Sequence, residues 1–347
     1  MIKILFPFSW LYGLITDFRN WLFDKGLMKS TTFDIPIINV GNLTVGGTGK
    51  TPHVEYLIKL LKNSKEIATL SRGYGRKTKG FLLADNQANA QTIGDEPYQF
   101  YQKFGNEIAV CVGEKRVEAI QKMRALKPDT NVIILDDAFQ HRPIKPSLNL
   151  LLVDYNRPIY DDFPFPVGRL RERRHGAKRA DAVIVSKCPK DLSQQERQII
   201  QQNLQPYLQA NAPVFFTKIL YGKPRNYRSE DTDLDGNKIL LLSGIANPVL
   251  FEVYAKEHFE VVNHLIYPDH HDFSEQDLLA IHQQFKQDIK AVLMTEKDMV
   301  KFQPLLGHPL LQNVSLFYLP IEIDFLTAEM KKGFDEMISV ACKMFYI

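Results

Sequence analysis

The segment 37–52 contains the residue types and the spacing that bind a nucleotide phosphate. Its pattern predicts a buried strand, a glycine-rich turn and the first turn of a helix. Glycines at 46, 47 and 49 let backbone N–H groups turn inward, and with the helix N-terminus these donors form a cradle for phosphate. Lys50 would reach the β- and γ-phosphates, and the Thr51 hydroxyl would bind Mg²⁺. The predicted phosphate-binding residues are Thr44, Val45, Gly46, Gly47, Thr48, Gly49, Lys50 and Thr51.

This segment departs from the strict G-x-x-x-x-G-K-[ST] pattern at one position, because Thr44 stands where the first glycine is expected. Residues 46–51 instead resemble the GG-x-GKT variant of one branch of P-loop proteins. Val45 replaces the lysine that some members of that branch carry before the two glycines. A glycine-rich turn without a ligand is the alternative, but the strand before the turn and the helix after it favour a phosphate site.

Two adjacent acids follow a second apolar run. Residues 132–135 are apolar and lead directly into Asp136 and Asp137. This arrangement resembles a strand whose terminal carboxylate holds Mg²⁺ directly or through water. Neighbouring carboxylates repel each other unless a cation lies nearby, which favours a metal site over a structural role. We predict that Thr51 and these two acids form the Mg²⁺ site, and the sequence leaves open which acid contacts the ion.

Loops that follow other predicted strands contain basic and polar side chains. Residues 71–76 follow a strand predicted over 66–70, and residues 138–142 continue the loop after Asp137. In a parallel α/β sheet such loops lie on the ligand face. Arginine suits a phosphorylated substrate or anionic lipid headgroups, and a solvated run of charge is the alternative. The candidate substrate residues are Arg72, Gln140, His141, Arg169 and Arg171.

The strand predicted over 182–187 leads to the place where GTPases carry [NT]-K-x-D. The aspartate of that motif pairs with the guanine edge, but the fourth position here is Pro189. Without this carboxylate, ATP is the better prediction for the nucleotide.

The N-terminal segment 1–30 contains both tryptophans of the chain. Its apolar residues recur at helical spacing and form one stripe, whereas Asp17, Arg19, Asn20 and Asp24 occupy other faces. These polar residues interrupt any run near the roughly 20 apolar residues that a transmembrane helix needs. We therefore expect an amphipathic helix that lies on a membrane without crossing it. The alternative is a helix that packs on the protein's own core.

Length and composition set the wider frame. The 347 residues allow two domains, and the net charge of +3 does not indicate a nucleic-acid partner. Three widely spaced cysteines argue against a zinc knuckle or a disulfide framework, which fits a cytoplasmic compartment. The predicted fold is α/β, with a P-loop NTPase-like, mostly parallel sheet and a second, smaller α/β domain. After the helix of 1–30, we expect a kinase domain over 31–220, a connecting segment over 221–237 and the smaller domain over 238–347.

Two further segments contain candidate functional groups. Asp95 either caps a helix over 98–104 or takes part in chemistry. His270 and His271 are flanked by acids, but adjacent side chains in a strand diverge and no third metal ligand is identifiable. An Asp–His pair or a general base is therefore favoured over a metal site. The charges of 295–298 suit a ligand or a helix cap, and the sequence does not decide between them.

The combination of these motifs resembles the tetraacyldisaccharide 4'-kinase family of Gram-negative bacteria over nearly the whole chain. The motifs that carry the resemblance are those at 41–52, 71–76, 94–97, 136–142, 268–271 and 295–298. The resemblance implies phosphorylation of the 4'-hydroxyl of a tetraacylated glucosamine disaccharide 1-phosphate in lipid A biosynthesis, with ATP and Mg²⁺. It also implies peripheral or monotopic attachment at the cytoplasmic face of the inner membrane, and we expect a monomer.

The resemblance also suggests roles for individual residues. It makes Asp95, helped by His270, the candidate base that accepts the proton of the sugar hydroxyl, while Lys50 acts on the phosphates. Two other functions are considered. One is a P-loop switch GTPase, ATPase or metallochaperone, which the GG-x-GKT variant favours but the missing guanine-binding acid and C-x-x-C pair do not. The other is a membrane-associated binding protein that retains the loop as scaffold.

Overall fold

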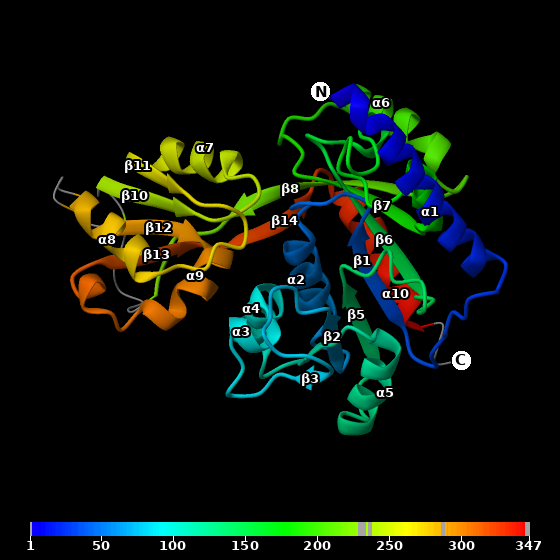
Figure 1. The fold of residues 1–347 in the computed structure, drawn as a ribbon, viewed down its shortest axis with the longest axis horizontal. Helices are drawn as coiled ribbons and strands as arrows, with labels where there is room; N and C mark the ends of the chain where they lie inside the picture. Colours follow the sequence, from blue (N-terminus) through cyan, green and yellow to red (C-terminus); the bar gives the residue numbers. More distant parts are fainter. Residues whose placement is uncertain (1, 228–233, 235–237, 286–288, 290, 344–347) are drawn as a thin grey trace.

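The computed structural model describes residues 2–227, 234, 238–285, 289 and 291–343. These residues form two β-sheets with helices packed on them, and the antiparallel strand pair Val214–Tyr221 and Ile321–Phe325 lies where the two meet (Figure 1). Most strand pairs are parallel. The arrangement confirms the predicted fold class, a P-loop NTPase-like sheet accompanied by a smaller α/β unit.

The larger sheet carries the phosphate-binding segment. Among the described residues it has nine strands in the order β14-β8-β7-β6-β1-β5-β2-β4-β3. The strands between β8 and β4 run parallel, and β14 and β3 pair antiparallel at the two edges. The strands are β1 (Ile37–Asn42), β2 (Ile67–Ser71), β3 (Leu82–Leu83), β4 (Ala109–Val112), β5 (Val132–Asp136), β6 (Leu148–Asp154), β7 (Ala182–Ser186), β8 (Val214–Tyr221) and β14 (Ile321–Phe325).

Helices cover both faces of this sheet, so successive residues of β1 pack in different cores. Ile38 belongs to the core that contains Leu57 of α2, whereas Ile37 belongs to the core that contains Ile120 of α5. Strands buried on both faces are continuous apolar runs, which is why they were readable in the sequence. The helices are α2 (Lys50–Leu61), α3 (Ala90–Ile93), α4 (Asp95–Phe104), α5 (Arg116–Leu126), α6 (Gln194–Leu204) and α10 (Ala328–Lys343).

The smaller sheet follows the same principle. Among the described residues its order is β11-β10-β12-β13-β9, with only β9 antiparallel. Leu240 and Leu241 face different cores, one on each side of the sheet. The strands are β9 (Arg225–Asn226), β10 (Lys238–Ser243), β11 (Glu260–Ile266), β12 (Ala291–Thr295) and β13 (Ser315–Leu319), and the helices are α7 (Val249–His258), α8 (Glu275–Gln284) and α9 (Glu296–Phe302).

The C-terminal segment corrects the expected extent of the smaller domain, which was 238–347. Strand β14 pairs with β8 of the larger sheet (Figure 1), and Phe334 and Ile338 of α10 belong to the same core as Leu57 of α2. The physical reason is that the apolar face of α10 is buried against the larger sheet and not the smaller one. The expected connecting segment, 221–237, includes β9 of the smaller sheet and lies partly outside the described residues, as do residues 344–347.

Helix α1 (Phe6–Asp24) packs on the larger unit through small and polar residues and through Phe23 near its C-terminal end. Ser9, Gly13 and Asn20 are buried, whereas the large apolar residues of the opposite face are exposed. The exposed residues of α1 include Phe8, Trp10, Leu11, Leu14, Ile15, Phe18 and Trp21. The stripe therefore does not pack on the protein's own core, which was the alternative. Over the described residues, none of the helices has the length and apolar character needed to span a bilayer.

Candidate active site

The phosphate loop, residues 43–49, joins the end of β1 to the start of α2 as the sequence pattern predicts. Gly46 and Gly49 have φ angles of +114° and +79°, which residues with a Cβ rarely adopt. The Thr48 side chain is buried and accepts a hydrogen bond from Asn42 Nδ2 at 2.7 Å. The loop thus offers backbone N–H groups at the N-terminus of a 12-residue helix, where an anion is stabilised.

The second of the two acids after β5 is paired with cations. Asp137 lies in the left-handed region, with φ +50°, and its Oδ1 is 2.8 Å from Arg171 Nη1 and 3.7 Å from Lys50 Nζ. Burial opposes the charge of Asp137, but Lys50 and Arg171 outweigh this effect and hold the pKa of the carboxyl below its usual range. The carboxylate therefore connects the phosphate-loop lysine to the loop that contains Arg171.

For the first acid, the charge of Lys50 does not offset the effect of burial. Asp136 is 3 % exposed, and its Oδ2 accepts a hydrogen bond from the Ser71 hydroxyl at 3.2 Å. Burial and, next, the charge of Glu96 raise its pKa to about 7. Within the described residues, its Oδ1 is buried without a hydrogen-bond partner. A buried carboxylate oxygen with no donor is suited to a cation.

The residues around Asp136 fit a magnesium ion. The Thr51 hydroxyl donates to Glu96 Oε1 at 3.4 Å, so a hydroxyl and two carboxylates supply the oxygen ligands that Mg²⁺ prefers. Glu96 was not among the predicted site residues. Its position beside Asp95, in a segment that follows the basic loop 71–76, was the signal that could have identified it.

Asp95 and His270 come together from different units of the fold. His270 Nδ1 lies 3.1 Å from Asp95 Oδ2, and the imidazole also packs against Tyr74 with ring centroids 5.1 Å apart. Asp95 is the first residue of α4, with Gly94 as the N-cap, so it is not the helix cap that the sequence allowed. His270 has φ +60°, and this turn of the backbone directs the ring toward α4.

The segment 295–298, which the sequence left undecided, serves three purposes. Thr295 caps α9 together with Asp298, which also accepts a hydrogen bond from the backbone N–H of Gly244. Glu296 pairs with Lys103 of α4 at 2.9 Å. Lys297 Nζ lies 3.4 Å from His270 Nε2, beside the catalytic candidates. Burial opposes the charge of Lys297, but neighbouring acids, led by Glu96, raise its pKa.

The five candidate substrate residues occupy different environments. Arg171 and Gln140 adjoin Asp137, since Gln140 Oε1 lies 3.4 Å from Arg171 Nη1. Arg72 and Arg169 are exposed, and the carbonyl of Arg169 accepts a hydrogen bond from the Val45 N–H at 2.8 Å. Burial, followed by the charge of Arg116, lowers the pKa of His141 to about 4, so this imidazole is neutral.

Glu172 is a buried acid next to the candidate substrate residue Gln140, and the sequence did not single it out. Its carboxylate is 3 % exposed and accepts hydrogen bonds from Asn20 of α1 at 2.7 Å, from Arg179 at 2.6 Å and from Gln140 at 3.1 Å. It thereby links α1 to the loop after Asp137. The residue stands inside an arginine-rich run, which concealed its significance.

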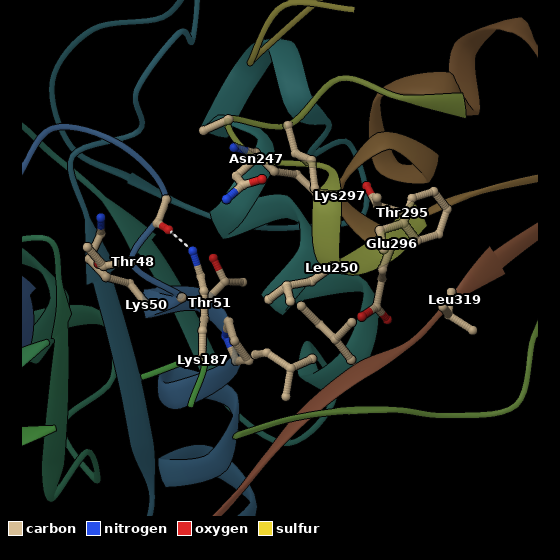
Figure 2. A pocket seen from close by; sticks show the side chains of 18 of the residues that line it. Thr48, Lys50, Thr51, Lys187, Asn247, Leu250, Thr295, Glu296, Lys297 and Leu319 are labelled. Atoms are coloured by element: carbon tan, nitrogen blue, oxygen red, sulfur yellow. Dashed lines mark hydrogen bonds between the residues drawn. The ribbon is translucent and has the colours of Figure 1, made fainter. Parts of the chain in front are cut away.

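A cavity lies between the two units, with the phosphate loop and α2 on one side (Figure 2). Lys50, Thr51 and Lys187 line its polar part, and Lys297 enters from the smaller unit. Apolar side chains form another part of the wall, namely Ile219, Tyr221, Leu250, Phe251, Leu319 and Ile321, and the acids Glu96, Asp269 and Glu296 also line the cavity. This combination suits a nucleotide, whose phosphates require donors and whose base requires an apolar surface.

The fold and this site define a P-loop phosphotransferase. A family model described as Tetraacyldisaccharide-1-P 4'-kinase matches residues 1–340. A Tetraacyldisaccharide 4'-kinase of Flavobacterium psychrophilum is 46 % identical and covers 97 % of this chain and 95 % of that protein. One of Phocaeicola vulgatus is 44 % identical, with 93 % and 91 % covered. The crystal structure of LpxK from Aquifex aeolicus in complex with ATP is 30 % identical, with a TM-score of 0.75, and covers 98 % of this chain and 99 % of that one.

The chain belongs to the tetraacyldisaccharide 4'-kinase family. It is a lipid kinase of lipid A biosynthesis that uses ATP and Mg²⁺, which confirms the expectation from the sequence motifs. The alternative of a switch GTPase or metallochaperone is not supported.

Proposed function

We propose that this chain transfers the γ-phosphate of ATP to the 4'-hydroxyl of tetraacyldisaccharide 1-phosphate, with Asp95 as the base. The observation that carries the proposal is the 3.1 Å contact between Asp95 and His270, whose chain neighbours Glu96 and Asp269 line the same cavity as the phosphate loop. Phosphoryl transfer requires in-line positioning, neutralised phosphate charge and an acceptor for the hydroxyl proton. The described residues supply a group for each requirement.

The phosphate end of the site holds the donor nucleotide. The N–H groups of the phosphate loop and the Lys50 ammonium bind the β- and γ-phosphates, and Thr51 with Asp136 holds Mg²⁺. When bound, Mg²⁺ neutralises part of the phosphate charge. Asp137 keeps Lys50 and Arg171 together, because it contacts both cations. We assign the direct metal contact to Asp136, since its free oxygen is buried, whereas the Asp137 carboxylate is already paired.

The acceptor end holds the sugar hydroxyl. As its oxygen bonds to the γ-phosphorus, the bond to the β-phosphate oxygen breaks, and the hydroxyl proton passes to Asp95. His270 Nδ1–H donates to the Asp95 carboxylate and orients it toward the hydroxyl. Lys297 lies beside His270, so the smaller unit contributes a cation near the transferred phosphoryl group.

The lipid substrate explains the exposed face of α1. Trp10, Ile15 and Phe18 are each at least 60 % exposed, and an apolar surface of this size is stabilised at a membrane interface. Phe163 and Phe165 extend the surface, since their rings contact Phe6 and Tyr12 of α1. We propose that the chain binds as a monomer to the cytoplasmic face of the bacterial inner membrane through this surface. We infer no nucleic-acid partner.

The decisive experiment follows labelled γ-phosphate from ATP to purified tetraacyldisaccharide 1-phosphate in mixed micelles. A bisphosphorylated lipid should form with the natural chain and not with Lys50→Ala. If ATP is consumed while the lipid stays unmodified, the proposed acceptor is wrong. If the Lys50→Ala protein is as active as the natural chain, the phosphate loop is not the catalytic site.

A further inference from the structure

Three successive backbone carbonyls of the phosphate loop accept hydrogen bonds from side chains beneath the loop. We call them the floor carbonyls, and they belong to Gly47, Thr48 and Gly49. Lys187 Nζ donates to the first, as the dashed line in Figure 2 marks. Ser186 Oγ donates to the second at 2.8 Å, and His53 Nδ1 lies 2.7 Å from the third. The donors come from the end of β7 and from the first turn of α2.

The Lys187 and Ser186 donors are themselves held in place. The Lys187 ammonium also contacts Asp154 Oδ2 at 2.7 Å, and its backbone turns with φ +61° at the end of β7. Ser186 is fully buried. Motifs of guanine-binding proteins use this lysine position next to a base-reading acid, but Pro189 occupies the place of that acid. The contact with the loop explains Lys187 without a guanine base.

His53 has one possible arrangement of its protons. Its Nε2 lies 3.0 Å from the Thr217 hydroxyl, and a backbone carbonyl can only accept. Nδ1 therefore carries the hydrogen and donates to the loop, while Nε2 accepts from Thr217. Burial is the main cause that lowers the pKa of His53 to about 4, so the ring is neutral at ordinary pH.

The geometry of the peptide bond gives these contacts a function. In a planar trans peptide the C=O of one residue and the N–H of the next point in opposite directions. Holding the floor carbonyls downward therefore turns the N–H groups of Thr48, Gly49 and Lys50 upward, toward the phosphates. We propose that His53, Ser186 and Lys187 are positioning residues that orient the phosphate cradle before ATP binds. This inference rests on ATP occupying the phosphate loop.

A pair of substitutions at one position tests the inference. An asparagine amide nitrogen occupies nearly the position of the histidine Nδ1, whereas the glutamine amide nitrogen occupies that of Nε2. His53→Asn should keep the donor to Gly49 and retain ATP affinity within about threefold. His53→Gln should lose the donor and weaken ATP and ADP binding by about tenfold, the size expected for one hydrogen bond. Adenosine binding should not change in either variant, because adenosine has no phosphate.

Truncations of the other donors provide the second line of evidence. Ser186→Ala removes one hydroxyl, and Lys187→Met keeps the side-chain length while removing the charge. Both should raise the KM for ATP more than they lower kcat, whereas Lys190→Met, at an exposed neighbouring lysine, should leave both constants unchanged. If His53→Gln does not fold, the Ser186 and Lys187 variants still test the inference.

Two results would overturn the inference. One is equal ATP affinity in His53→Asn and His53→Gln. The other is a parallel loss of ATP and adenosine binding in the Ser186 and Lys187 variants, which would indicate general damage to the fold.

The variant Lys50→Ala tests separately whether ATP occupies the phosphate loop, which the inference assumes. If that variant binds ATP normally, the phosphate loop is not the ATP site. If it loses ATP while the floor-carbonyl variants do not, only the positioning role fails.

Discussion

The carboxylate of Asp95 and the imidazole of His270 lie 3.1 Å apart although 175 residues separate them in the chain. Asp95 begins a helix of the larger unit, and His270 lies in a loop of the smaller one. The proposed catalytic pair therefore exists only while the two units are in contact. The proposed proton transfer therefore depends on how the two units are arranged.

The pair predicts a non-additive kinetic effect. Asp95→Asn should lower kcat by a factor on the order of 10² to 10⁴ with ATP affinity retained, because the base is lost. His270→Gln should cost less, since it acts through Asp95. The double variant should be about as slow as Asp95→Asn alone. Losses that multiply in the double variant would show that the two residues act independently.

Removing the charge at Asp136 should separate stability from activity. Asp136→Asn should abolish kinase turnover and yet raise the free energy of unfolding in EDTA by about 1–3 kcal/mol, because no described residue donates a hydrogen bond to the buried carboxylate oxygen. Added Mg²⁺ should stabilise the natural chain and not the variant. Urea unfolding with and without Mg²⁺ measures both effects. Equal stabilisation of both proteins by Mg²⁺ would place the ion elsewhere.

The buried cluster of Glu55, Lys103 and Glu296 should stabilise the contact between the units. Lys103 Nζ lies 2.6 Å from Glu55 and 2.9 Å from Glu296. Lys103→Met removes the cation from both acids and should cost about 3–5 kcal/mol at pH 8. Burial raises the pKa of Glu55 to about 7, so this carboxyl is protonated and neutral at low pH.

The sign of the pH effect at this cluster follows from the raised pKa of Glu55. The folded state binds the Glu55 proton more tightly than the unfolded state, so stability falls as pH rises between about 4.5 and 7. The penalty of Lys103→Met should therefore be smaller at pH 5 than at pH 8. Lys122→Met, at an exposed position of α5, is the control and should have no effect. A penalty that is independent of pH would contradict the proposed pairing.

The lowered pKa of His53 predicts that stability falls as pH drops, which is opposite to the effect of Glu55. Its pKa is lowered from 6.5 to about 4, so the unfolded state takes up a proton first and stability falls as pH drops through this window. The contribution amounts to about 3 kcal/mol between the two values. The free energy of unfolding of the natural chain, measured relative to that of His53→Asn, should therefore fall by this amount between pH 7 and pH 4. Urea titrations of both proteins across this range test the prediction, and parallel pH curves would contradict it.

Substitutions on the exposed face of α1 should weaken membrane binding without changing the stability of the fold. Ile15→Ser with Phe18→Ser should reduce sedimentation with phosphatidylethanolamine–phosphatidylglycerol vesicles by about tenfold or more, since each side chain contributes about 1.5–3 kcal/mol when buried. The unfolding midpoint should remain the same, because both residues are about 60 % exposed. Leu126→Ser, at an exposed site on α5, should leave vesicle binding intact. Equal losses in both proteins would argue against a specific surface.

Sequence patterns determined the features that depend on neighbouring residues. The strand, glycine turn and helix around Lys50 were predictable because their periods and φ requirements act over a few positions. The apolar run before Asp136 placed both acids at the end of a strand for the same reason. The stripe of α1 followed from helical spacing, and the family motifs identified the reaction.

Only the tertiary structure decided how distant residues combine. It paired Asp137 with Arg171, left one Asp136 oxygen without a partner in the described part of the chain, and brought Lys187 and His53 beneath the same loop. It also placed β14 and α10 on the larger sheet, where the expected domain boundary was wrong. Periodicity specifies which face of an element is apolar, but not which partner covers it. That choice depends on the packing of the whole chain, because the free energy of burial is shared among residues that are far apart in the sequence.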